Sequence, residues 1–188
     1  DRSKALGERL VLDAVAHGLD AVIVAPTAVV GPYDYRPSHF GRVVLALARG
    51  RVPAVINGGY DWVDVRDVVE GAIRASTDAS PGSKYMLSGR WASLAEVPTH
   101  ISHVRHCREP LACLPAWVGA ACAPFSEAFC RLRGTEPLLT RFAVEALSKH
   151  ANVSHALASR DLRYGPRPLE DTIADTIRWF ERSGYIAP

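Results

Sequence analysis

The residues best suited to chemistry lie in one short polar loop. It follows an apolar run, Ala21–Ala25, which predicts a strand buried on both faces of a parallel sheet, and then a turn, Pro26–Pro32. In open α/β sheets, ligands lie just beyond the carboxyl ends of the strands. We therefore expect the turn to border a bound molecule and the loop to face it. The loop residues that offer hydrogen bonds are Asp34, Tyr35, Arg36 and His39.

A second group of residue types suggests a metal site. His100, His103 and His106 follow one another at a spacing of three, and Cys107 comes next. On a helix, the first and last of these histidines are turned by about 120° from each other. The set itself includes no carboxylate. The spacing therefore favours a solvated helix face, and we predict no metal.

The cysteines give no sign of a metal or redox motif either. Cys107, Cys113, Cys122 and Cys130 include no pair spaced as C-x-x-C. Buried, reduced thiols are the favoured interpretation, with disulfides as the alternative.

Size and charge exclude several classes of partner. The chain has 188 residues, enough for one domain with a sizeable core, and a formal net charge of +2. So small a charge gives no reason to expect a nucleic acid or an anionic membrane. No apolar run approaches the roughly 20 residues of a spanning helix, and Asp1–Lys4 does not resemble a signal peptide. We expect a cytoplasmic protein.

Hydrophobic periodicity predicts the elements that position the loop. Leu6, Leu10 and Ala14 fall four apart within Ser3–His17 and predict a helix that ends at Gly18. The next expected element is a helix that is capped by Ser38 and runs to Arg49. Three strands are expected at Val52–Ile56, Tyr60–Val65 and Lys84–Leu87. A further helix, Arg66–Thr77, is expected with its start capped by Asp64 and Asp67.

The second half of the chain is predicted to be mostly helical. The expected helices are Ser93–Cys107, Cys113–Arg133 with a break near Pro124, Leu139–His150, a short one within Asn152–Asp161, and an amphipathic Leu169–Ser183 ended by Gly184.

Several segments, in order, resemble motifs of the extended short-chain dehydrogenases/reductases. Ser3–Glu8 is similar to the end of the family's Tyr-x-x-Ser-Lys-x-x-x-Glu segment. The strand Ala21–Ala25 and the turn Pro26–Pro32 follow at the family's usual distance. Trp62–Val68 resembles the later strand-to-helix signature. Tyr164–Leu169, with the helix that follows, resembles the C-terminal end.

Two further segments narrow the resemblance. Gly31–Asp34 and Gly58–Asp67 are most similar to bacterial dihydroflavonol 4-reductase-like members of the NAD-dependent epimerase/dehydratase family. Each motif alone is weak, but their order and spacing together are specific and cover nearly the whole chain.

The resemblance implies an α/β fold in two parts. Residues 1–78 would be mostly the C-terminal portion of a Rossmann-type parallel sheet, and residues 79–188 mostly a smaller, helical substrate-binding lobe. The implied cofactor is NAD or NADP. Lys4 would contact the cofactor ribose and lower the pKa of a tyrosine four residues earlier. Pro26, Thr27 and Val29 would lie beside the nicotinamide.

The same resemblance implies that a part is missing. The tyrosine would precede Asp1, and the sequence lacks both a G-x-x-G-x-x-G loop after an early strand and the family's upstream serine or threonine. We expect the C-terminal part of a longer protein whose dinucleotide-binding half, on the order of 130–170 residues, is absent. We also expect this chain to be inactive alone and to self-associate through an exposed strand edge.

The implied reaction is hydride transfer between a nicotinamide and a small-molecule ketone, aldehyde or alcohol. A sugar epimerase or dehydratase of the same family is the alternative. Epimerases of this family often carry an arginine that binds the substrate phosphate near the position of Tyr60. Tyr60 has no positive charge, which weakens the epimerase alternative. We take Tyr60 as a substrate-binding candidate. From another class, a non-catalytic dinucleotide-sensing or interaction module stays open.

Overall fold

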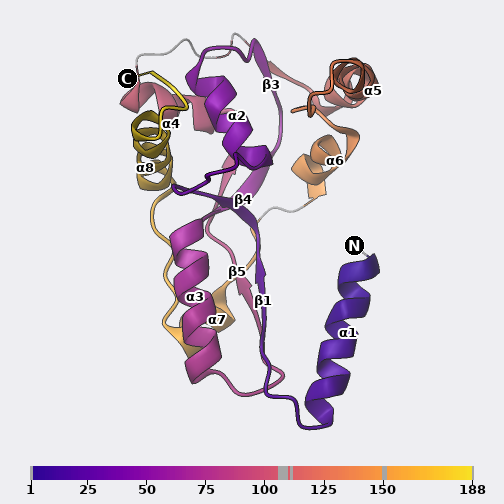
Figure 1. Ribbon diagram of the computed structural model, residues 1–188, viewed down its shortest axis with the longest axis vertical. Helices are drawn as coiled ribbons and strands as arrows, with labels where there is room; N and C mark the ends of the chain where they lie inside the picture. The colour runs from indigo at the N-terminus through magenta and orange to yellow at the C-terminus, as the bar shows by residue number, and fades with distance from the viewer. Residues whose placement is uncertain (1, 106–109, 111, 150–151, 188) are drawn as a thin grey trace.

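Residues 2–105, 110, 112–149 and 152–187 are described here in a computed structural model of the chain (Figure 1). They form an α/β protein in which three pairs of strands run parallel. None of the helices in these ranges combines the length and the apolar character needed to cross a membrane.

The described strands form three small sheets. β1 (Ile23–Pro26) lies parallel to β5 (Lys84–Leu87). In the second sheet, β4 (Gly59–Asp64) lies between β2 (Ala28–Val30), which is parallel to it, and β6 (Arg90–Ser93), which is antiparallel. β3 (Ala54–Ile56) pairs in parallel with β7 (Ala112–Leu114). Only Thr27 separates β1 from β2, so the chain passes directly from one sheet to the next.

The helices divide the molecule into two regions (Figure 1). α3 (Val65–Asp78) and α7 (Ala156–Leu162) pack together beside β1 and β5. At the other end, α2 (His39–Ala48), α4 (Glu96–Val104) and α8 (Leu169–Arg182) pack on one another. α5 (Ala116–Leu132) and α6 (Arg141–Lys149) form a pair on the side of β3.

Each region has its own apolar core. Around α8, the fully buried side chains include Ile173, Ile177 and Phe180, which belong to one cluster with Val44 of α2 and Ile101 of α4. Around β5, a smaller cluster holds Leu87, Leu162 and Tyr164. The strong amphipathic pattern of residues 169–183 therefore places α8 at the centre of the larger core, as the sequence predicts.

α1 (Arg2–Ala16) stands apart from the rest of the molecule (Figure 1). None of its residues is buried, and Leu6 and Leu10 are 58% and 60% exposed. An ion pair of 2.6 Å between Lys84 Nζ and Glu8 Oε1 connects it to β5. The predicted helix is confirmed, and the first half of its apolar face, with Leu6 and Leu10, is exposed.

The structure corrects the expected environment of the first strand. The prediction was burial on both faces, whereas Ile23, Val24 and Ala25 are each half-buried. Among the described strands, only β5 pairs with β1, so its other edge is open. The open edge that we expect on the basis of the resemblance is therefore present.

Three boundaries in the second half were also predicted wrongly. Ser93 is the last residue of strand β6, and α4 begins only at Glu96. The amide and the hydroxyl of Ser93 both donate to Glu96 Oε1 at 3.0 Å, ahead of the helix. Cys113 lies in β7. α5 continues through Pro124 without a break. Pro124 has no amide proton, so the helical hydrogen bond to the carbonyl of Ala120 is missing. Ala120 is exposed, and its carbonyl can bind water instead.

The three described cysteines are free thiols, but the predicted burial is wrong for two of them. These cysteines are Cys113, Cys122 and Cys130, and the first two are exposed. Cys107 and His106 lie outside the described residues.

Candidate functional site

The turn after β1 and β2 encloses a small cavity at the carboxyl ends of these strands. The cavity measures about 220 Å³ and is lined by Val29–Asp34, Ser38 and Val65. Gly31 has a φ of 156°, and a Cβ there would lie 2.7 Å from Val65 Cγ1. The start of α3 thus approaches the turn so closely that only glycine fits. Of the predicted residues, Val29 and Asp34 meet in this cavity.

Thr27, predicted to lie beside a nicotinamide, has a hydroxyl with nothing to bind among the described residues. Its Oγ1 is buried and has no hydrogen-bond partner. Its backbone amide donates to the Leu87 carbonyl at 3.2 Å and continues the pairing of β1 with β5. The backbone amide of Thr27 is therefore not free to bind a ligand. The unpaired hydroxyl is the polar group that a ligand at this turn could satisfy.

Lys4 lies on a different element, in the first turn of α1. This helix runs antiparallel to β1 (Figure 1). Lys4 is exposed and does not line the cavity. Its predicted place beside the same ligand as Pro26, Thr27 and Val29 stays a prediction.

The polar loop is held by hydrogen bonds and aromatic contacts of its own. The Asp34 carboxylate accepts from the Ser38 amide at 2.8 Å and from its hydroxyl at 2.8 Å. Ser38 Oγ in turn accepts from the Gly41 amide and caps α2, as the sequence predicts. The Tyr35 ring packs edge-on against Trp179 at 5.3 Å, and its carbonyl accepts from the Tyr185 hydroxyl.

His39 lies at the point where the loop meets α2, and it is half-buried. Burial lowers the pKa of its imidazole, and the neighbouring Arg42 charge lowers it further, while Glu136 acts in the opposite direction. Arg42 and Glu136 form an ion pair. Arg36 is exposed. The surroundings of His39 therefore favour the neutral form of its imidazole.

Tyr60 lies in an aromatic cluster farther along the same face. Its ring contacts Phe40 at 5.0 Å and Trp62 at 5.4 Å, both edge-on. The hydroxyl donates to the Ala143 carbonyl of α6 at 3.0 Å. Burial raises the pKa of Tyr60 to about 12, so the phenol stays protonated. Its donor is already used within the protein, and the position supplies no cation.

Charged residues at the start of α3 form a network that the sequence predicted only in part. Asp64 caps the helix by accepting from the Arg66 amide at 2.8 Å, as predicted. The Arg66 guanidinium donates to Asp64 Oδ2 at 2.7 Å and to Asp175 of α8 at 2.8 Å. Burial alone would raise the pKa of Asp64, but the hydrogen bonds from Arg66 hold it below its usual value.

Asp67 makes the second link to the C-terminal segment. It accepts from the Arg167 amide at 2.8 Å and forms an ion pair of 2.7 Å with the Arg167 guanidinium. Both carboxylates at the start of α3 therefore serve the structure, as the sequence predicts. The roles of Arg167 and Asp175 were missed, because a separation of about 100 residues leaves no local pattern.

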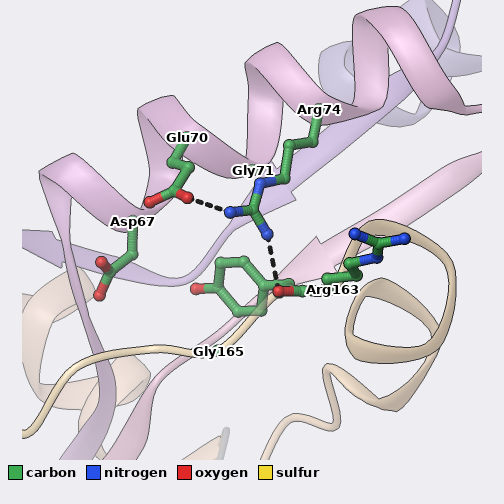
Figure 2. Close-up of a pocket in the computed structure, with 7 residues that line it drawn as sticks. Asp67, Glu70, Gly71, Arg74, Arg163 and Gly165 are labelled. Atoms are coloured by element: carbon green, nitrogen blue, oxygen red, sulfur yellow. Dashed lines mark hydrogen bonds and ion pairs between the residues drawn. The ribbon is translucent and has the colours of Figure 1, made fainter.

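Figure 2 shows a second cavity, of about 140 Å³, between α3 and the segment after α7. Arg74 pairs with Glu70 and donates to the carbonyls of Leu162 and Arg163 at 3.0 and 2.8 Å. Arg163 has a positive φ of 51° at the end of α7. Arg74 thus satisfies the last carbonyls of that helix. We interpret this cavity as a structural junction.

The side chains of the described residues include no group of histidines, cysteines and carboxylates that could hold a metal ion. His100 and His103 lie on the helix α4, but the predicted solvated face is confirmed only for His103, which is exposed. His100 is half-buried, and its Nε2 is enclosed with no hydrogen-bond partner among the described residues.

Comparisons with known proteins identify relatives along most of the chain. Residues 1–87 match the NAD dependent epimerase/dehydratase family. A Synechocystis sp. protein that carries a provisional dihydroflavonol 4-reductase name is 28% identical over 189 residues, which cover 98% of this chain and 55% of that protein. Sterol demethylase protein B of Methylococcus capsulatus is 28% identical over 190 residues, which cover 99% of this chain and 57% of that protein.

The fold is also found in a solved structure. The crystal structure of gox2253 superposes with a TM-score of 0.77 and 33% identity, over 95% of this chain and 55% of that one. This likeness supports a Rossmann-type α/β fold. The chain spans about half the length of the curated relatives it matches.

Proposed function

Because residues 1–87 match the NAD dependent epimerase/dehydratase family, we propose that the protein containing this chain is an NAD(P)-dependent oxidoreductase. In this proposal, the protein would reduce the carbonyl carbon of a ketone or aldehyde with a hydride that a bound nicotinamide would supply, and a proton would be delivered to the carbonyl oxygen. The alcohol is oxidised in the reverse direction. The observation that carries the proposal is the small cavity at the carboxyl ends of β1 and β2, where Val29 and Asp34 lie and where Gly31 lets the start of α3 come close.

The residues at this turn fit the nicotinamide end of the cofactor. The apolar side chains of Pro26 and Val29 can pack against a flat ring, and the unpaired Thr27 hydroxyl can bind a carboxamide. When bound, the cofactor would supply the hydride. The role proposed for Lys4 is to hold the ribose and to favour the ionised form of a nearby phenol. Its ammonium group is exposed and thus accessible for both tasks.

Contacts of the charged residues favour a reductase over a nucleotide-sugar epimerase. A diphosphate needs cations, and Arg is the usual choice for binding it. Arg66 is paired with Asp64 and Asp175, and Arg167 with Asp67. Tyr60 donates its hydroxyl to Ala143. These positions therefore offer no free guanidinium to a sugar nucleotide.

The test is turnover of the whole protein with NADH or NADPH and a series of ketones and aldehydes, followed by nicotinamide absorbance. We expect Lys4→Met to lower kcat/KM by about 100-fold or more, the usual contribution of an assisted proton transfer. Arg9→Met, which removes a charge from the same helix, serves as the control. Net oxidation of the reduced nicotinamide distinguishes a reductase from an epimerase, whose overall reaction is redox-neutral. Equal effects of both variants would count against the role of Lys4.

We further propose that the 188-residue chain alone has no turnover, because it carries no glycine-rich dinucleotide loop. A fluorescence titration with NADH and NADPH tests this. We expect no saturation below roughly millimolar concentration, because the turn offers few contacts for a ligand of this size. Tight, saturable binding would show that the chain holds a complete dinucleotide site elsewhere.

A further inference from the structure

A larger cavity borders the larger core beside α2, and Leu47 and Val55 belong to both. It measures about 280 Å³ and is lined by residues of α2, β3, β7 and α5 together with Val52, Pro53, Leu94, Leu138 and Leu139. No lining residue is charged, and Cys122 is the one with a polar side chain. Cys122 is also exposed, so it marks where the cavity opens to solvent.

The cavity is adjacent to the polar loop. His39, Val43 and Leu47 are spaced four apart on α2 and therefore share one face of the helix. His39 belongs to the loop end of that face, while Val43 and Leu47 line the cavity. The Arg42–Glu136 ion pair ties α2 to the segment that contributes Leu138. A molecule lying along this face would meet polar groups first and apolar ones beyond.

Close packing of α5 shows that the cavity is not simply a loose gap. A Cβ at Gly119 would lie 3.0 Å from Ile56 Cδ1 and 3.2 Å from Val144 Cγ2. The helix is therefore in tight contact with β3 and α6 at Gly119. Val118 and Cys122 of the same helix line the cavity beside Gly119, but they do not fill it.

We propose that this cavity binds the hydrocarbon part of the substrate, an uncharged alicyclic or medium-chain alkyl group joined to the reacting carbonyl or alcohol. Its role as a substrate site rests on the proposed function. Apolar cavities of roughly 150 Å³ stay dry and bind benzene, so a cavity about twice as large has room for a group of roughly ten carbons. A sugar would bury hydroxyls with no hydrogen-bond partner here.

The first test measures binding to the chain itself. N-Phenyl-1-naphthylamine, whose fluorescence rises in apolar surroundings, is titrated and then displaced by 2-decanone or by UDP-glucose. We expect saturable binding, displacement by the ketone and none by the sugar nucleotide. Cys122→Phe fills the opening and should weaken binding by about tenfold, because a filled cavity excludes the probe.

Ala121→Phe is the matched control, since it adds the same ring at an exposed position next to Cys122 that does not line the cavity. Circular dichroism shows whether each variant is folded, and Val43→Phe tests the opposite wall if Cys122→Phe is not. Equal loss of binding in the Ala121 variant, or displacement by UDP-glucose, would overturn the proposal.

A second readout does not depend on a bulky variant. Alkylation of Cys122 by N-ethylmaleimide, followed by peptide mass spectrometry, should slow when 2-decanone is present. Cys113 is exposed but does not line the cavity, so its rate should stay constant. Equal rates at Cys122 with and without the ketone would contradict the proposal. If the ketone protects Cys122 but the whole protein never oxidises a nicotinamide, the proposed function fails while the apolar binding site stands.

Discussion

Asp64 joins three elements through one carboxylate. It ends β4, caps α3 and holds the Arg66 side chain that reaches Asp175 on α8. The Asp64 side chain is fully buried, and that of Arg66 is 28% exposed. Breaking such a pair is costly because it leaves a charge without its partner in a poorly solvated place. The network therefore helps to hold α8 against the start of α3.

We expect Asp64→Asn to lower the free energy of unfolding by about 2 kcal/mol at neutral pH, since asparagine keeps the cap but loses the charge. The pKa of Asp64 is lower in the folded state than in the unfolded chain. Its stabilisation is therefore complete above the unfolded pKa of about 4 and is lost as the pH falls through the folded pKa. Urea unfolding at neutral and acid pH should show the difference between the two proteins shrinking in acid.

Asp13→Asn on exposed α1 provides the control for this experiment. It should leave stability within about 0.5 kcal/mol of the original value, as surface substitutions usually do. An equal loss for Asp64→Asn at both pH values would show that charge is not the source of the stabilisation.

At the scale of elements, Tyr60 connects two segments that no continuous sheet joins. β4 and α6 meet where its hydroxyl donates to Ala143, and its ring packs between Phe40 and Trp62. α6 otherwise packs chiefly on α5, and both lie on the side of β3 (Figure 1). The hydroxyl thus helps to fix the helix pair that borders the apolar cavity.

We expect Tyr60→Phe to lower the free energy of unfolding by about 1 kcal/mol, the usual net value of one hydrogen bond. Amide hydrogen exchange should speed up in α6 and stay unchanged in α8, because only α6 loses its link to β4. Tyr35→Phe is the matched control, since Tyr35 is 73% exposed. Unchanged exchange in α6 would show that packing alone holds this helix.

At the scale of the whole molecule, apolar side chains are exposed on two separate faces. α1 exposes Leu6 and Leu10, and α5 exposes Trp117, Phe125, Phe129 and Leu132. The Phe125 side chain is 78% exposed and that of Leu132 is 88% exposed. Apolar surface of this kind, together with the open edge of β1, is typical of an interface.

We propose on this basis that the chain self-associates. Light scattering over a concentration series should give an apparent mass that rises with concentration. Phe125→Glu should reduce that rise, because it places a charge in the apolar face of α5. Ala120→Glu adds the same charge at another exposed position of the helix without removing an aromatic ring, and should have the smaller effect. A constant monomer mass at high concentration would contradict the proposal.

The sequence predicted the long amphipathic elements because periodicity is a local property. The helices at residues 2–16, 39–48, 65–78 and 169–182 were expected within a few residues, and Ser38 and Asp64 were correctly predicted as caps. The motif order likewise indicated the NAD dependent epimerase/dehydratase family, whose pattern matches residues 1–87, and the dihydroflavonol 4-reductase-like relative in the comparisons. The site roles of Lys4, Pro26 and Thr27 stay predictions that rest on this resemblance.

The tertiary structure decided what depends on partners far along the chain. β2 and β7 have three residues each, too few for a periodic pattern, and they form because β4 and β3 lie beside them. The apolar cavity arises where α5 approaches β3 closely at Gly119 yet leaves space at the neighbouring turns. Local sequence encodes which face of a helix is apolar, but only packing decides whether that face is filled, exposed or left open to a ligand.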